Sequence, residues 1–178
     1  MLHISISEEV ATACPDLHVL VLSCDVCNSE PDERLWQEIA DEEKVVRETV
    51  KLEQINKWLP IQATRQAYKR LGKDPNRYRP SSEALRRRIL RELPLYKVDT
   101  LVDLINLVSI RSGYSIGGFD ADKIAYVELV VATDARNTRR IVVLTDPTRA
   151  DKMSQITISL FDVPEKEARR IIAKTYKK

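Results

Sequence analysis

The stretch TLVDLINLVS, residues 100–109, predicts a buried helix. Asp99 precedes it in the position of a helix N-cap, and Gly113 follows it as a residue suited to a helix end. The apolar side chains cover almost the whole circumference of the helix: Leu101, Val102, Leu104, Ile105, Leu107, Val108 and Ile110. We therefore expect neighbouring elements to cover this helix on nearly all sides.

Two polar residues interrupt the apolar surface of this helix. Asp103 and Asn106 are three positions apart, so they share one strip of it. A buried carboxylate or amide is unfavourable unless it is hydrogen-bonded. The pair therefore either fastens neighbouring loop backbone or lines a pocket. For Asn106 alone a structural role is the better interpretation, whereas the pair, beside a loop that contains Gly117 and Gly118, indicates a pocket.

The residues beyond Gly113 favour strands. Apolar runs rich in valine and isoleucine predict three of them, at Val127–Ala132, Arg140–Thr145 and Gln155–Phe161. A basic helix is expected after them, from about Glu165 to Tyr176. Strands and helices therefore share the chain, and the architecture expected is α+β.

The residues before Asp99 begin with a strand. Leu17–Val26 is a short, nearly continuous apolar run, which is typical of a buried strand. An acidic stretch follows at Glu30–Glu53, where apolar residues recur at helical spacing and predict one or two amphipathic helices. A solvent-exposed helix face is the preferred interpretation of the acidic residues.

Pro60 interrupts this helical pattern, and two shorter helices are expected after it. The first ends at about Leu71, because Gly72 suits the left-handed position that follows a helix. The segment Lys73–Pro80 holds two prolines and predicts a fixed, extended loop. Ser81 or Ser82 can then cap a second helix that runs to about Leu93.

Positive charge is concentrated in these two helices and their loop. Ten basic residues lie between Arg65 and Arg91, and only Asp74 and Glu83 oppose them. Arginine suits bidentate contacts to phosphate, and tyrosine can stack on bases or ribose. The residues expected to contact RNA are Arg77, Tyr78, Arg79, Arg86 and Arg87. The alternative, almost equally favoured by charge alone, is that the arginines pair with the acidic helices of residues 30–53.

The composition excludes several classes of protein. The 178 residues are 43% hydrophobic, enough to bury the core of one compact domain. The net charge of +2 does not by itself indicate a nucleic-acid-binding protein. No apolar run reaches the roughly eighteen residues that a membrane helix needs, and no secretory signal is visible. A cytoplasmic protein without a membrane partner is expected.

Neither a metal site nor a catalytic group is predicted. Cys24 and Cys27 have the spacing of a metal or redox motif, but a zinc site needs about four ligands and no second pair exists. Reduced thiols at the end of a strand are favoured over zinc, and zinc over redox catalysis. The residue types contain no legible nucleophile–base arrangement, and no cofactor is expected.

Three blocks of the sequence resemble one known family. They are RQAYKRLGKDPNRYRPSSEALRRR at residues 65–88, TLVDLINLVS at residues 100–109 and GGFDADKI at residues 117–124. Their order and spacing are similar to the B-three/four domain, which edits mischarged tRNA in bacterial phenylalanyl-tRNA synthetase. The first block is closer to free-standing single-domain relatives than to the synthetase itself. The resemblance covers roughly residues 60–125.

The resemblance implies a fold and a division of the chain. It implies a single compact α+β domain of the phenylalanyl-tRNA synthetase beta-subunit editing type, with helices packed on a mixed or antiparallel sheet. Residues 1–59 are expected to form an N-terminal strand and acidic helices of the same domain. Residues 60–178 are expected to form the editing-like, tRNA-binding region.

The resemblance also implies a pocket and a partner. Asn106 falls on a pocket-lining asparagine of the synthetase domain, so the expected pocket comprises Asp103, Asn106, Gly117 and Gly118. The expected partner is tRNA or aminoacyl-tRNA, with the amino-acid moiety as the small ligand. The expected activity is deacylation of misacylated tRNA; the alternative is a non-catalytic RNA- or amino-acid-binding module.

This chain departs from the family pattern at two pocket positions and in one segment. Gly117 stands where the synthetase has a pocket histidine, and Ile105 where it has a small polar residue. Relatives carry a longer glycine-containing segment before their last strands, which supplies the other wall of the pocket. Either this segment is shortened here, or further residues belong after about position 126, and the second alternative is the one expected.

Overall fold

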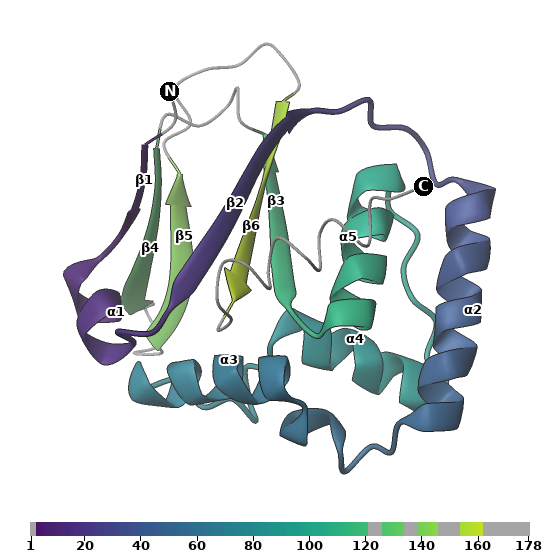
Figure 1. Ribbon diagram of the computed structural model, residues 1–178, viewed down its shortest axis with the longest axis horizontal. Helices are drawn as coiled ribbons and strands as arrows, with labels where there is room; N and C mark the ends of the chain where they lie inside the picture. The colour runs from purple at the N-terminus through teal and green to yellow at the C-terminus, as the bar shows by residue number, and fades with distance from the viewer. Residues whose placement is uncertain (1–2, 121–125, 134–138, 146–153, 162–178) are drawn as a thin grey trace.

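The computed structural model describes residues 3–120, 126–133, 139–145 and 154–161, with backbone alone at residues 3, 4, 23 and 24 and beyond Phe119. Its helices and strands are largely segregated along the chain, with α2 to α5 followed by β3 to β6, which is the α+β arrangement expected (Figure 1). The described strands form two three-stranded sheets. Within the described residues no helix is both long enough and apolar enough to span a membrane.

The first sheet is mixed and the second is antiparallel. In the first, β1 pairs in parallel with β4, which pairs antiparallel with β5; the bounds are His3–Ile6, Tyr126–Thr133 and Arg139–Thr145. In the second, β6 lies between β2 and β3; the bounds are Ser154–Phe161, His18–Asp25 and Ser115–Asp120. The three strands predicted at β4, β5 and β6 are confirmed to within one residue at each end. Residues 121–125 connect β3 to β4.

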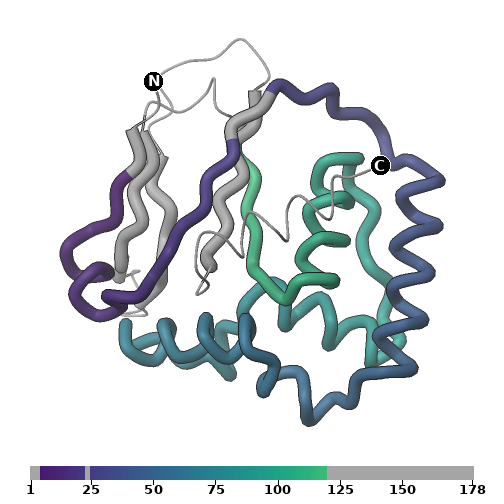
Figure 2. The backbone as a smooth tube through the Cα atoms, in the orientation of Figure 1, coloured from purple at the N-terminus to yellow at the C-terminus, as the bar shows by residue number. Residues whose placement is uncertain are grey.

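The helices lie at the ends and along one side of the strands (Figure 1). Their bounds are α1 Glu8–Ala13, α2 Glu33–Thr49, η1 Ile55–Lys57, α3 Leu59–Arg70, α4 Ser81–Leu90 and α5 Thr100–Ser112. The single helix α2 occupies most of the acidic stretch. The tube in Figure 2 shows α3 crossing below the strands, while α5 lies between β3 and α2.

Local signals set the ends of α5 and α3 as the sequence predicts. The Asp99 carboxylate accepts a hydrogen bond from the Val102 amide at the start of α5. Gly113 ends α5 with φ 81°, and Gly72 follows α3 with φ 75°. Left-handed angles of this kind strain any residue that carries a Cβ, which explains the glycines.

The helical part of the core joins α2, α4 and α5. Val46, Ile89 and Ile110 come from these three helices and form one buried cluster. Burying an aliphatic side chain of this size stabilises the fold by about 2 kcal/mol. The cluster fixes α4 against α5, and these two helices carry the candidate sites described below.

The burial of α5 differs from the prediction. Asp103, Leu107 and Ile110 are buried, whereas Ile105 and Asn106 are only partly buried. Helices α2 and α4 and strand β3 pack against α5. They leave part of its surface beside a cavity, so the prediction of burial on nearly all sides was wrong.

Strand β2 is also more exposed than predicted. Val19 and Val21 are partly buried, and Leu22 is 36% exposed. The reason is its position: β2 pairs with β6 on one side and forms an edge of its sheet. An apolar run identifies a strand without showing whether that strand lies at an edge.

Three local predictions were wrong in detail. Gly117 and Gly118 lie in strand β3 and not in a loop, because β6 supplies a pairing partner distant in the sequence. Neither Ser81 nor Ser82 caps α4; Pro80 holds the N-cap position without a side-chain bond. Helix α4 ends at Leu90, earlier than expected. The helix predicted at residues 165–176 lies outside the described residues.

Candidate functional site

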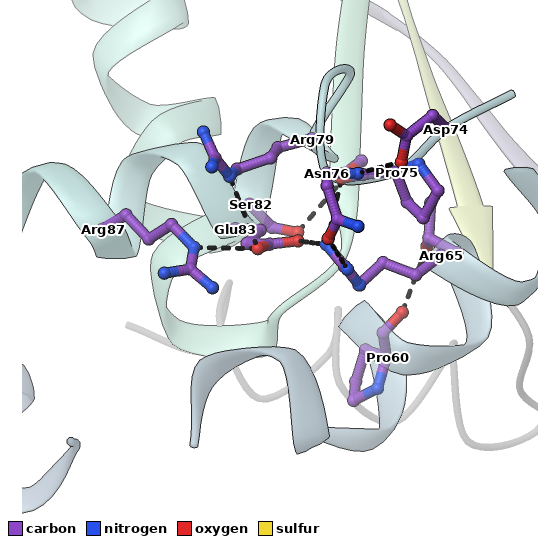
Figure 3. Close-up of polar contacts among 11 residues, drawn as sticks. Pro60, Arg65, Asp74, Pro75, Asn76, Arg79, Ser82, Glu83 and Arg87 are labelled. Carbon is purple, nitrogen blue, oxygen red and sulfur yellow. Dashed lines mark hydrogen bonds and ion pairs between the residues drawn. The ribbon is translucent and has the colours of Figure 1, made fainter. Parts of the chain in front are cut away.

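A buried carboxylate organises the arginine-rich segment. Glu83, in the first turn of α4, has no exposed surface. Its carboxylate lies 2.8 Å from Arg65 Nη1, 2.8 Å from Arg87 Nε and 3.8 Å from Arg79 Nε. Figure 3 shows Arg79 and Arg87 approaching Glu83 from one side and Arg65 from the other. A buried charge is tolerated only with such partners, so Glu83 and these three arginine side chains hold one another in place.

The loop before α4 is fastened to the same cluster. Arg65 donates to the Pro75 carbonyl at 3.0 Å and to the Asn76 side-chain oxygen at 2.6 Å (Figure 3). The backbone N–H of Asn76 in turn donates to the Asp74 carboxylate at 2.9 Å. Arg65 is 12% exposed, so it holds the loop in place and does not face solvent.

Beside this cluster lies a cavity of about 360 Å³ walled by arginines. Its lining residues are Arg77, Arg79, Ala84, Arg87, Arg88, Arg91 and Leu93. Five arginines line it and, among the described residues, no carboxylate does; Glu83 lies buried behind Arg79 and Arg87. We name this feature the arginine cavity. Clustered guanidinium groups of this kind suit phosphate oxygens.

Arg86 does not belong to the arginine cavity. It is 7% exposed, and its guanidinium donates two hydrogen bonds to the Ile110 carbonyl at the end of α5. The same group lies 3.5 Å from the Trp58 ring centroid. Burial lowers the pKa of Arg86 to about 10, partly offset by the negative charge of Glu42. The expectation that Arg86 contacts RNA was therefore wrong, because its guanidinium is occupied inside the fold.

The acidic helix α2 makes no described ion pair with the arginine-rich segment, although the charge of Glu42 acts on the buried Arg86. The described ion pairs of α2 join Glu38 and Glu42 to Arg111, while Arg47 and Lys44 pair within α2 itself. The described ion pairs of the arginine-rich segment instead go to Glu83, which belongs to that segment. The alternative that pairs its arginines with residues 30–53 is not what the described contacts show.

The tyrosines of the segment are less available than expected. Tyr78 is partly buried, and Lys73 and Arg77 lie 5.5 and 5.3 Å from its ring centroid. Burial raises the pKa of Tyr68, and Lys73 also lies 4.1 Å from that ring. Among the described residues, the aromatic side chain classed as exposed is Tyr96, which the sequence did not single out.

A second cavity, of about 290 Å³, lies between α5 and β3. Its lining residues are Asp99, Leu101, Val102, Ile105, Asn106, Ile116, Gly118 and Phe119. The structure thus brings Asn106 and Gly118 together, as expected; Gly117 is not among the lining residues. We name this feature the Asn106 cavity. A Cβ on Gly118 would lie 3.1 Å from Ile105 Cδ1, so glycine keeps this wall open.

Asp103 faces away from the Asn106 cavity. Its fully buried carboxylate accepts hydrogen bonds from Trp36 Nε1 at 2.5 Å and from the Val98 amide at 3.2 Å. It therefore ties α2 and the preceding loop to α5. The prediction that Asp103 lines a pocket with Asn106 was wrong. The sequence does not show that Trp36 lies next to Asp103 in the fold. The indole N–H of a buried Trp needs an acceptor, and Asp103 supplies it.

The chemistry of the Asn106 cavity is limited. The Asn106 amide makes no hydrogen bond to any residue in the described part of the chain, so it is available to a ligand. Two amides at the start of α5 are occupied, since Leu101 donates to Asn28 and Val102 donates to Asp99. The described lining holds no histidine, cysteine, serine or lysine. Among the described residues no cluster of metal-ligating side chains occurs.

The comparison with known families gives one match. Residues 63–162 match the family described as B3/4 domain, the domain type found in the phenylalanyl-tRNA synthetase beta subunit. The matched span runs from α3 to β6 and includes the residues that line both cavities. Comparison with curated proteins and with solved structures gave no match.

Proposed function

This chain belongs to the B3/4 domain family, and on that premise we propose that it is an RNA-binding protein whose partner is tRNA or aminoacyl-tRNA. The arginine cavity carries the proposal. Five arginines line one hollow, and the buried carboxylate of Glu83 holds two of them, Arg79 and Arg87, in place. Together they form a surface complementary to the RNA backbone. Arg77, Arg79 and Arg87 were expected in this role from the sequence, and Arg88 and Arg91 join them.

The Asn106 cavity is proposed as the site of the aminoacyl group. Its lining is mostly apolar, with the free amide of Asn106 as a polar group that can orient a ligand. A cavity of about 290 Å³ suits one amino-acid side chain better than a nucleotide. Asn106 and Gly118 are the residues proposed to contact this group.

The lining of this cavity favours binding over hydrolysis. Ester hydrolysis needs a positioned water and a group that stabilises the oxyanion. Asp99 is the only carboxylate among the described lining residues, and it already caps α5. The proposed function is therefore recognition of tRNA, with deacylation of a misacylated ester as the second candidate, which the B3/4 family favours.

The RNA-binding proposal is tested with a double substitution at the arginine cavity. Arg77 and Arg91 line the cavity and are both exposed, so Arg77→Ala with Arg91→Ala should leave the fold intact. We expect weaker binding to every tRNA species, measured by fluorescence anisotropy. Arg34, exposed on α2, supplies the matched control, and Arg34→Ala should bind as the parent does. Equal affinity of the double variant and the parent contradicts the proposal.

The choice between binding and hydrolysis is tested separately. The full chain is incubated with a panel of mischarged tRNAs, and release of the amino acid is followed over time. No release above the spontaneous rate, together with measurable affinity, supports the binding module. Release that is lost in Asn106→Leu supports the deacylase.

A further inference from the structure

Tyr96 is the exposed aromatic residue next to the arginine cavity. It lies in the segment between α4 and α5, and 68% of its surface is exposed. Leu93, in the same segment, is 44% exposed and lines the cavity. An exposed aromatic ring either forms a contact surface for a partner or is exposed without any function. Its surroundings decide between the two.

Arg88 connects Tyr96 to the arginine cavity. Its guanidinium lines the cavity and lies 4.4 Å from the Tyr96 ring centroid. The same group donates from Nε and Nη2 to the Pro94 carbonyl, at 3.0 and 2.8 Å. Three contacts therefore fix Arg88, and Arg88 in turn supports one face of the Tyr96 ring. With 68% of the residue exposed, much of the ring surface that Arg88 leaves uncovered is accessible to solvent.

The neighbouring cation does not compete for this open face. Lys97 lies 4.9 Å from the ring centroid of Trp36, so its charge is directed away toward α2. The ring thus combines a supported face, an open face and adjacent guanidinium groups. Base–aromatic stacking together with a cationic groove is how proteins hold single-stranded nucleic acid.

We propose that Tyr96 and the arginine cavity form a binding site for an unpaired nucleotide of RNA. The base stacks on the open face of Tyr96, and the adjoining phosphates contact Arg88 and Arg91. A base inside a duplex offers no free face, so the ligand is single-stranded at this point. This inference rests on the proposed RNA-binding function and specifies which part of the RNA the cavity receives.

The test uses a short unstructured RNA that carries a fluorescent purine analogue. Stacking quenches such a base, so the quench reports contact with Tyr96 independently of affinity. Tyr96→Ala should remove the quench and weaken binding roughly five- to hundredfold. Tyr96→Phe keeps the ring and should preserve both readouts. Leu59→Ala, at another exposed apolar residue outside the cavity, is the control and should change neither.

A blunt duplex of the same sequence separates this inference from the proposed function. The duplex should bind more weakly than the single strand, and Tyr96→Ala should leave its affinity unchanged. Single strand and duplex could bind with equal affinity that depends on Arg77 and Arg91 and is unchanged by Tyr96→Ala. That result overturns this inference and leaves the proposed RNA binding intact. If no RNA binds the parent chain, both proposals fall.

Discussion

Arg86 and Arg87 are neighbours in α4 but have different environments. Arg86 bonds to the Ile110 carbonyl and stacks on Trp58, whereas Arg87 pairs with Glu83 at the wall of the arginine cavity. A helix turns by about 100° per residue, so adjacent side chains leave it in different directions. In α4 one direction leads into the core and the other to the cavity.

This difference predicts separate effects of two arginine substitutions. Arg86→Ala removes hydrogen bonds from a charged donor and a buried cation–π contact, so we expect a loss of roughly 2–4 kcal/mol in the free energy of unfolding. RNA affinity of the folded protein should not change. Arg91→Ala should instead weaken RNA binding and leave the free energy of unfolding unchanged. Urea unfolding and anisotropy on both variants measure this, and an Arg86→Ala protein with parental stability contradicts the burial of Arg86.

The Glu83 carboxylate is predicted to be the most sensitive acidic residue of the segment. Glu83→Gln keeps the volume but leaves Arg65 and Arg87 without a buried counter-charge, so the expected loss of stability is about 3 kcal/mol. Asp41 supplies the control, since its pair with Lys44 is mostly exposed. Asp41→Asn should change stability by less than about 1 kcal/mol. Equal effects in urea unfolding count against the organising role of Glu83.

Asn106 is predicted to act on ligand binding and not on stability. Its amide has no hydrogen-bond partner among the described residues, so Asn106→Leu breaks no internal bond. We expect a change in the free energy of unfolding within about 0.5 kcal/mol, together with loss of aminoacyl recognition. Thermal melts and a comparison of charged with uncharged tRNA check this. A loss above about 1 kcal/mol would mean that the amide is satisfied inside the fold.

At the scale of elements, two glycines end helices under different constraints. Gly113 has φ 81°, and a Cβ there would lie 2.5 Å from Trp58 Cζ3. Gly72 has φ 75° and is exposed to solvent. The backbone conformation is thus the same while the surroundings differ.

Alanine at each position separates the free-energy cost of the left-handed backbone from the cost of a steric clash with Trp58. Gly72→Ala should lower the free energy of unfolding by about 1 kcal/mol, from the left-handed backbone alone. Gly113→Ala should cost more, because Trp58 must move, and Trp58 also supports Arg86. Urea unfolding of both variants measures the difference. Equal losses contradict the close packing of Trp58 on the end of α5.

At the scale of the whole molecule, a net charge of +2 is compatible with strong dependence of RNA binding on salt. The positive charge is gathered at the arginine cavity, while the acidic residues of α2 pair elsewhere. Five arginine contacts to single-stranded RNA predict a slope of log affinity against log salt of about −3.5. Arg91→Ala should reduce its magnitude by about 0.7. A flat salt response excludes the arginine cavity as the contact surface.

The sequence by itself determined the features that depend on near neighbours in the chain. The Asp99 cap, the two glycines that end helices, and strands β4, β5 and β6 follow from side-chain chemistry and periodicity over a few residues. The three blocks identified the B3/4 family for the same reason, since each block is a run of adjacent residues. The sequence also pointed to Asn106, which lines a cavity in the structure, because its helix and spacing are local.

Only the tertiary structure decided which polar residues are available. Asp103 bonds to Trp36, 67 positions away, and Arg86 bonds to Ile110, 24 positions away. Tyr96 is exposed because its segment passes outside α4, and β3 exists because β6 pairs with it. A charged or aromatic residue binds a ligand only if the fold leaves it unsatisfied, and contacts between distant parts of the chain determine that. Residue type and spacing carry no information about such contacts. The sequence therefore located the arginine-rich segment, but only the structure showed the cavity and which arginines line it.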